Sequence, residues 1–179
     1  GGLNYNFSQK SNLFLNAGFI NRQPLFDAVF RGFGNDIASD LKNERIESVE
    51  LGYGFRSNAF KVNVNAYITK WDDRFVTRTF KNQGDDFTSQ FPDVDVLHKG
   101  IEAEATYRPT GRTTIKGMVS IGDWRYTDDF SGKTYNENLE LVGEETLYLK
   151  DVKVGNAAQF TAFIGIDQKV GDKLSFDLD

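Results

Sequence analysis

The sequence contains no cysteine and only one histidine among its 179 residues. The absence of cysteine excludes a disulfide framework, a thiol nucleophile and a thiolate metal site. A metal site at the single histidine, His98, would need several further ligands at suitable spacing. We therefore expect His98 to be an ordinary residue that begins a strand at the edge of a long loop, and we expect no cofactor.

Long apolar runs and an excess of positive charge are also missing. No apolar run approaches the length of about 18 residues that marks a transmembrane helix, which leaves only strands as a way to cross a membrane. The formal net charge of −5 argues against a nucleic acid partner, because such a partner requires clustered positive potential. The chain starts at Gly1 and Gly2 directly on a strand pattern, so no signal peptide can be read from it.

Residues 43–71 carry the clearest pattern that is present. Apolar and polar residues alternate along two arms, with Leu51 after Glu50 on the first arm and Val64 before Asn65 on the second. This period of two is typical of strands and not of helices. Each arm has about ten to thirteen residues, which exceeds the usual soluble strand and matches a tilted strand across a bilayer.

The same alternation divides the whole chain into eight strand-like segments. They begin near residues 3, 13, 43, 60, 101, 115, 158 and 174. Short turns near Lys10, Ser57, Thr110 and Gly171 alternate with three long segments at residues 23–43, 72–98 and 128–156, which we expect to be loops without regular structure. The pattern predicts an all-β fold, an antiparallel up-and-down meander of about eight long strands, with turns at one end and long loops at the other, as in outer-membrane barrels.

Aromatic residues are abundant, with 16 phenylalanines against 3 prolines. One group stands on the apolar side of the strands near the short turns, where an interfacial girdle is expected: Phe7, Phe55, Phe60 and Tyr107. A second group stands on the polar side near the long loops and is expected to face the lumen or to lie above the membrane: Trp71, Trp124 and Tyr126.

Three carboxylates on the polar side of the strands, Glu50, Glu102 and Glu104, could suggest acid/base catalysis. A general base needs defined placement and a tuned pKa, and an alternating strand pattern indicates neither. A water-filled lumen tolerates such charges, and we expect them to pair with Lys61, Lys116 and Arg108. The chain is therefore predicted not to be an enzyme. The acidic third long segment is expected to be a solvated extracellular surface.

Four stretches of this sequence resemble the barrels of TonB-dependent outer-membrane receptors, most closely those found in Bacteroidota. The stretches are residues 16–30, 41–56, 98–107 and 148–165, in the order in which the family has them and with its alternation of short turns and long loops. The resemblance implies a barrel of twenty-two strands around an N-terminal plug. Residues 1–179 would then be a piece from the second half of that barrel, without the plug, the TonB box or the final strands.

This resemblance also implies a function. The intact protein would lie in the outer membrane of a Gram-negative cell and take up a scarce ligand, such as a ferric siderophore or another metal chelate, when the TonB complex acts on the plug. Its partners would be the outer-membrane lipid, its own plug and remaining strands, TonB and the small ligand. Arg22, Arg31, Arg74 and Arg78 are candidate contacts for an anionic ligand, and Glu50, Glu102 and Glu104 are further candidate contacts on the inner wall.

Two other interpretations remain open from the sequence. Eight strands could close into a complete small membrane barrel with a structural or adhesive role. The strands could also form a soluble β-sandwich that binds a ligand through its long loops, in which case the apolar side would be a buried core.

Overall fold

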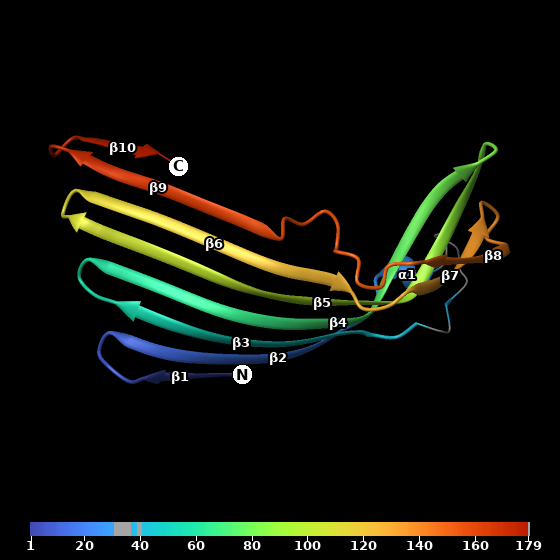
Figure 1. Ribbon diagram of the computed structural model, residues 1–179. Helices are drawn as coiled ribbons and strands as arrows, with labels where there is room; N and C mark the ends of the chain where they lie inside the picture. Colours follow the sequence, from blue (N-terminus) through green and yellow to red (C-terminus); the bar gives the residue numbers. More distant parts are fainter. Residues whose placement is uncertain (31–36, 39–40, 179) are drawn as a thin grey trace.

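The computed structural model describes residues 1–30, 37–38 and 41–178, and it places all ten strands of the described residues in one sheet (Figure 1). The elements in chain order are β1 (Gly2–Asn6), β2 (Ser11–Arg22), α1 (Phe26–Val29), β3 (Glu44–Arg56), β4 (Phe60–Asn82), β5 (Asp85–Thr110), β6 (Thr113–Tyr126), β7 (Phe130–Asn136), β8 (Leu141–Leu147), β9 (Phe160–Val170) and β10 (Leu174–Leu178).

The predicted meander of eight strands is confirmed. The order across the sheet is β1-β2-β3-β4-β5-β6-β9-β10, and every pairing along it is antiparallel. In the described part of the chain, β1 pairs only with β2 and β10 only with β9. The sheet therefore neither closes into a small barrel nor packs on a second sheet, and both alternative interpretations are wrong for this structure.

Two of the three long segments differ from the prediction, because they contain regular strands. β4 and β5 continue through residues 72–98 as one long hairpin, whose turn at Gln83 and Gly84 has positive φ angles of 53° and 102°. Two residues with positive φ suit a tight hairpin turn. Residues 128–156 contain the hairpin of β7 and β8, and β7 also pairs with residues 87–90 near the start of β5. We call the part of the sheet beyond Arg74, formed by β4, β5, β7 and β8, the extension sheet.

The strand registers confirm the two predicted faces. Leu51 lies opposite Ala66, which lies opposite Ile101, so these apolar side chains form one row across the wall. The neighbouring row runs from Asn65 to Glu102 and is polar. We call the face of Leu51 the outer face and the face of Glu102 the inner face.

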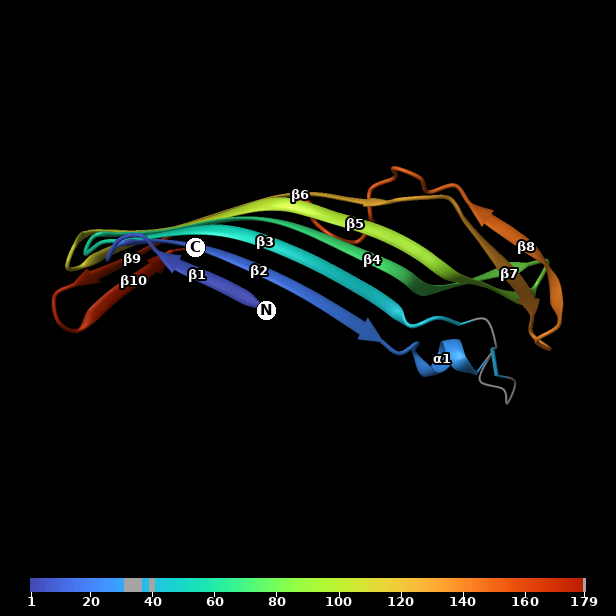
Figure 2. The same ribbon diagram turned by 90° about the horizontal axis from the view of Figure 1, so that it is seen from below.

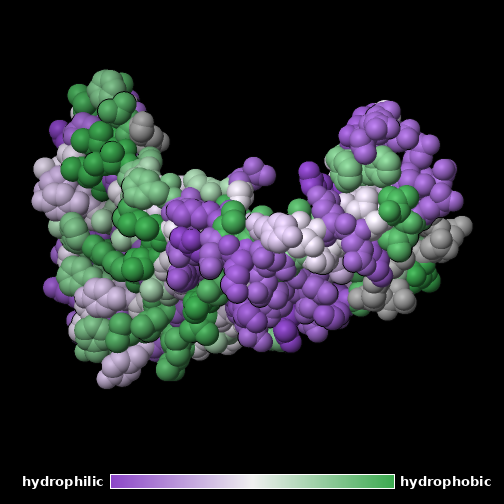
Figure 3. Space-filling model, turned by 45° about the vertical axis from the view of Figure 1, so that its right-hand side comes forward, coloured by the Kyte–Doolittle hydropathy of each residue, from purple (hydrophilic) through white to green (hydrophobic). Residues whose placement is uncertain are grey.

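The outer face is apolar and uncovered. Leu51 and Ile101 are 55% and 57% exposed, although they sit in the middle of long strands. Figure 2 shows that the sheet is arched, with α1 on its concave side, and Figure 3 shows hydrophobic side chains gathered on the convex face toward the short turns. A large exposed apolar surface marks contact with a membrane or a partner. This is the surface that the sequence predicts to face lipid.

Changes of residue type mark both ends of this apolar band. At the short turns, the rings of Phe60 and Tyr107 pack with their centroids 5.7 Å apart, as expected for a girdle. Toward the long loops, the outward row that contains Ile68 also contains Lys99, which lies opposite it on β5 and whose Nζ lies 3.4 Å from an oxygen of Asp123. On β4 the band runs from Phe60 to Ile68, which fits a tilted strand of about 9–11 residues across a bilayer. No helix in the described residues is long and apolar enough to span a membrane.

The inner face packs aromatic rings over glycines. A Cβ atom at Gly100 would lie 2.7 Å from the carbonyl oxygen of Ile121 and 2.7 Å from the hydroxyl of Tyr67, so only glycine fits there. Tyr67 is held in place because its hydroxyl accepts a hydrogen bond of 2.9 Å from Nε1 of Trp124. Gly52 similarly lies under the ring of Phe14. These contacts stiffen a wall that has no core of its own.

Candidate functional site

Two of the arginines predicted to contact a ligand, Arg22 and Arg74, lie over the ring of Trp71 on the inner face, where the long strands continue into the extension sheet. The guanidinium carbon of Arg74 lies 4.4 Å from the centre of the Trp71 ring, and that of Arg22 lies 5.5 Å from it. Glu44, which is only 2% exposed, accepts a contact of 2.7 Å from Arg22 and a hydrogen bond of 3.0 Å from Nε1 of Trp71. We call Arg22, Glu44, Trp71 and Arg74 the arginine–tryptophan cluster.

An irregularity in β4 brings Arg74 into this cluster. Residues three apart on a regular strand point to opposite faces, so Arg74 would lie on the outer face if Trp71 lies on the inner face. The register shifts between Trp71 and Arg74, and Asp73 has a positive φ of 57°. Such a β-bulge adds a residue to one strand and redirects the side chains that follow. Arg74 therefore returns to the side of Trp71.

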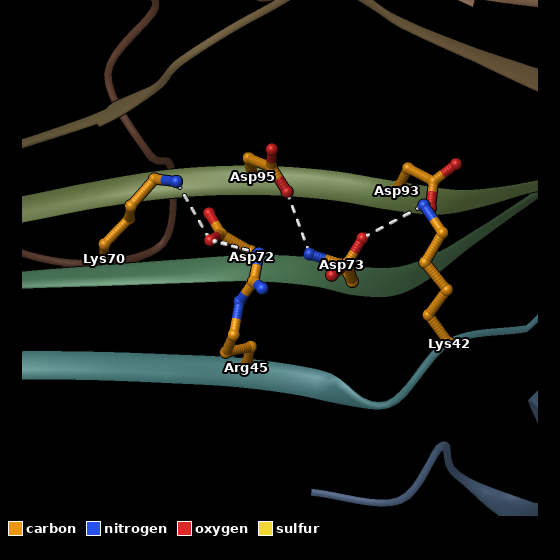
Figure 4. A network of polar contacts seen from close by, with 7 residues as sticks. All are labelled: Lys42, Arg45, Lys70, Asp72, Asp73, Asp93 and Asp95. Atoms are coloured by element: carbon orange, nitrogen blue, oxygen red, sulfur yellow. Dashed lines mark hydrogen bonds and ion pairs between the residues drawn. The ribbon is translucent and has the colours of Figure 1, made fainter. Parts of the chain in front are cut away.

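A network of charged side chains holds this bulge (Figure 4). The backbone N–H of Asp73 donates a 2.8 Å hydrogen bond to Oδ1 of Asp95. Lys42 Nζ lies 3.4 Å from an oxygen of Asp73 and 3.0 Å from one of Asp93. The bulge in β4 is thus held by Asp95 of β5 and by Lys42 of the first long segment.

The same network perturbs the acidity of its members. Burial raises the pKa of the Asp95 carboxyl above its usual value, and the neighbouring carboxylates of Asp72 and Asp73 add to this, while the N–H of Asp73 acts in the opposite direction. The hydrogen bond to Asp72, 2.9 Å long, raises the pKa of Lys70. The ion pair of Lys70 with Asp72 and the hydrogen bond from the Asp73 N–H to Asp95 together stabilise the bulge. No group of three or more potential metal ligands occurs among the described residues.

His98 differs from its prediction in position, because it lies well inside β5 and does not begin a strand. Its ring packs against Trp124 at 5.1 Å between centroids. Burial lowers the pKa of His98, and the positive charge of Arg74 lowers it further. Its Nε2 is buried without a hydrogen-bond partner in the described structure. Both effects favour the neutral imidazole, which packs on the Trp124 ring as part of the wall.

The other predicted arginines do not join the cluster. Arg78 lies on the extension sheet and forms an ion pair with Glu145. Arg31 lies outside the described residues. Among the described residues, no carboxylate forms an ion pair with Arg74, whereas the charge of Arg22 is matched by Glu44. Arg74 is thus the member of the cluster best suited to bind an anion.

The predicted carboxylates lie farther down the inner wall, in a region that we call the acidic strip: Glu50, Glu102 and Glu104. Nδ2 of Asn65 lies between two of them, 2.9 Å from an oxygen of Glu50 and 3.4 Å from one of Glu102. Asn16 donates to Glu50 over 3.1 Å, and Ser120 donates to Glu102 over 3.4 Å.

The partners of the strip differ from the expected ones. In the described structure amide and hydroxyl groups, and not Lys61 or Arg108, contact Glu50 and Glu102, and Lys116 binds Asp167 over 2.8 Å. The cross-strand register explains this, because it places Asn65, and no cationic residue, directly beside Glu102. The strip therefore keeps its negative charge exposed to the inner side.

Sequence reasoning missed Glu44 and the bulge at Asp73, although it placed Trp71 correctly on the inner side. An acidic residue at the first position of a strand gives no distinct signal. A bulge gives none either, apart from the adjacent pair Asp72 and Asp73 in a strand that is otherwise rich in β-branched and aromatic residues.

Comparison with known proteins agrees with this architecture. Two solved structures are similar in fold: "Copper transporter OprC", with a TM-score of 0.60 and 13% identity over 98% of this chain, and the FrpB iron transporter from Neisseria meningitidis (F3-3 variant), with a TM-score of 0.62 and 18% identity over 96% of this chain. The chain spans only 32% of the first of these proteins and 24% of the second. A search of curated protein sequences finds no match.

A sequence profile gives the family directly. The profile described as "TonB dependent receptor-like, beta-barrel" matches residues 1–174, which is nearly the whole chain. Membership of this receptor family agrees with the prediction that the chain is not an enzyme. The arched single-layer sheet, its apolar outer face and its polar inner face are the features of a barrel wall. The chain belongs to the TonB-dependent receptor β-barrel family.

Proposed function

We propose that residues 1–179 form part of the wall of an outer-membrane TonB-dependent transporter that takes up an anionic metal chelate, such as a ferric siderophore. The plug and the final strands of the barrel would be supplied by other parts of the protein. TonB would act through the plug, and the outer face would contact the outer-membrane lipid. The two similar structures are those of a copper transporter and an iron transporter, which supports a metal-containing cargo.

The observation that carries this proposal is the position of Arg74. Its guanidinium carbon lies 4.4 Å from the centre of the Trp71 ring, within the range of a cation–π contact, and no carboxylate among the described residues forms an ion pair with it. A guanidinium presents several N–H donors in a fixed plane and binds carboxylate and catecholate oxygens well. At the loop end of the inner face, it would meet a ligand entering from outside the cell.

Replacing Arg74 with alanine should weaken binding of an anionic ferric tricatecholate to the intact receptor about tenfold or more, because a charged hydrogen bond contributes about 1.5–3 kcal/mol. Binding is measured by titration with radiolabelled iron chelate. Arg112, in the short turn before β6, is the matched control, and its alanine variant should bind as the wild type does. A cationic ferric trihydroxamate should bind weakly to all three proteins.

Unchanged tricatecholate affinity in Arg74→Ala would contradict the role of Arg74. Equal binding of the cationic chelate and the anionic chelate by the wild type would contradict the charge preference. Either result would leave membership of the family untouched, because that rests on the sequence profile and the fold.

We also propose that the acidic strip docks cationic side chains of the plug. Glu50 and Glu102 face the inner side, are linked through Asn65 and contact only amides and a hydroxyl in the described structure. An uncompensated row of carboxylates favours a basic partner, and complementary charge fixes the register of an interface.

The double substitution Glu50→Gln and Glu102→Gln in the full-length receptor should therefore increase hydrogen exchange in the plug. The control is Glu47→Gln, since Glu47 is on the same strand but on the outer face. Exchange should be measured by mass spectrometry on the receptor in detergent. If the plug exchanges at the wild-type rate in the double variant, the strip does not hold it.

A further inference from the structure

A cavity of about 150 Å³ lies at the loop end, between the extension sheet and the first long segment. Its apolar lining comes from Leu41, Phe75, Pro92 and Tyr135, and its polar lining includes Lys133 and Glu144. All three long segments of the chain contribute to it. In Figure 1, β5 and β7 lie side by side at this end of the sheet.

The walls of this cavity are built by strand pairing. Gln90 lies opposite Lys133, and Lys133 lies opposite Glu144, so these residues share one face of the extension sheet. The other face carries a small core around Phe91 and Phe130, which fixes the sheet from behind. The cavity is therefore a feature of ordered strands.

β7 lies against β5 at Gly132, which lines the cavity. A Cβ atom at Gly132 would lie 2.5 Å from the carbonyl oxygen of Gln90 and 2.5 Å from the ring of Phe91. Only glycine permits this approach, and a larger residue would push the β7–β8 hairpin away. The spacing between β5 and β7, and with it the cavity, depends on this contact.

Size and lining together define a ligand group. A cavity of about 150 Å³ holds one benzene-sized ring. Phe75 and Tyr135 offer ring faces and edges for aromatic packing, and an ammonium group such as that of Lys133 is attracted to a π-face. Glu144 and Gln90 supply acceptors for a hydroxyl group. An aliphatic ring would gain neither the aromatic packing nor the attraction of a π-face to the ammonium group.

We propose that this cavity binds a single aromatic ring that carries a hydroxyl substituent. The ring belongs to an aromatic arm of the incoming chelate, and this assignment of the source rests on the proposed function. The cavity thereby selects catecholate or phenolate ligands at the loops, apart from the recognition of negative charge by Arg74.

The test uses the full-length receptor in detergent and 4-fluorophenol as the probe, followed by fluorine NMR line broadening. The wild type should bind the probe saturably, and cyclohexanol should not displace it. Leu41→Trp, which fills the cavity, should weaken binding at least tenfold, and Ala38→Leu provides a second filling variant from the same lining. Leu25→Trp is the control, because Leu25 is 55% exposed in the same long segment and does not line the cavity.

Three results would overturn the proposal: no saturable binding to the wild type, equal binding in Leu41→Trp and Leu25→Trp, or displacement by cyclohexanol. The two proposals fail separately, because Arg74→Ala should leave 4-fluorophenol binding unchanged. If Leu41→Trp weakens binding of the probe but not of ferric tricatecholate, the ring does not come from the chelate and the cavity binds a free phenol instead.

Discussion

Replacing Val64 with arginine in the intact receptor should lower the free energy of unfolding by about 2–4 kcal/mol, as expected for a charge on the lipid face near the bilayer midplane. Val64 lies on the outer face, midway between the girdle residue Phe60 and the end of the apolar band at Ile68. It is flanked across the sheet by Tyr53 and Ala103, neither of which carries a carboxylate to neutralise the new charge. The measurement is reversible unfolding in urea in the presence of lipid vesicles.

The adjacent residue provides the control. Asn65→Arg places the same charge on the inner face, between the carboxylates of Glu50 and Glu102. Its cost should be far smaller, because the inner face is wet and acidic. Equal costs for the two variants would show that the outer and inner faces have been assigned wrongly.

Replacing Gly100 with valine should destabilise the wall by about 1–3 kcal/mol, the usual cost of forcing extra atoms into a packed site. The new Cβ would meet the backbone oxygen of Ile121, which cannot move without breaking the pairing of β5 with β6. It would also displace Tyr67 and so break the hydrogen bond from Trp124. Thermal unfolding of the intact receptor, followed by its gel mobility with and without heating, measures the loss.

Gly18→Val is the matched control for this prediction. Gly18 also lies within a strand of the wall, but no atom lies within 4 Å of the position that its Cβ would take. Valine favours strands over glycine, so this variant should be as stable as the wild type or slightly more stable. Similar losses in both variants would mean that strand glycines matter for a reason other than the contact with Ile121 and Tyr67.

The wall could be predicted from the sequence because each of its strands has one apolar face and one polar face. The alternation around Leu51 and Val64 fixed the faces, and turns such as that at Gly171, whose φ is 68°, were marked by small or polar residues. Trp71 and Trp124 could be placed on the inner face by counting residues from these turns. Local patterns were sufficient for all of these features.

The site could not be predicted in the same way, because it depends on long-range packing. Simple alternation places Arg74 on the outer face, and only the bulge fixed by Lys42 and Asp95 returns it to Trp71. The extension sheet was missed for a related reason. Its strands are short of lipid-facing apolar residues, so their pattern resembles a polar loop, and they are stabilised by the pairing of β5 with β7 and by the small core around Phe91.

The two edge strands of the sheet, β1 and β10, have a consequence for how such a wall is stabilised. Apart from the β5–β7 contact and the β6–β9 pairing across the third long segment, each strand pairs with its neighbour in the chain. Unpaired backbone groups on an edge strand in lipid cost several kcal/mol each, so the free edges of β1 and β10 favour pairing with a further strand. Hairpins that follow one another in the chain therefore cover one another's edges, which keeps most strand pairings of the wall local in sequence.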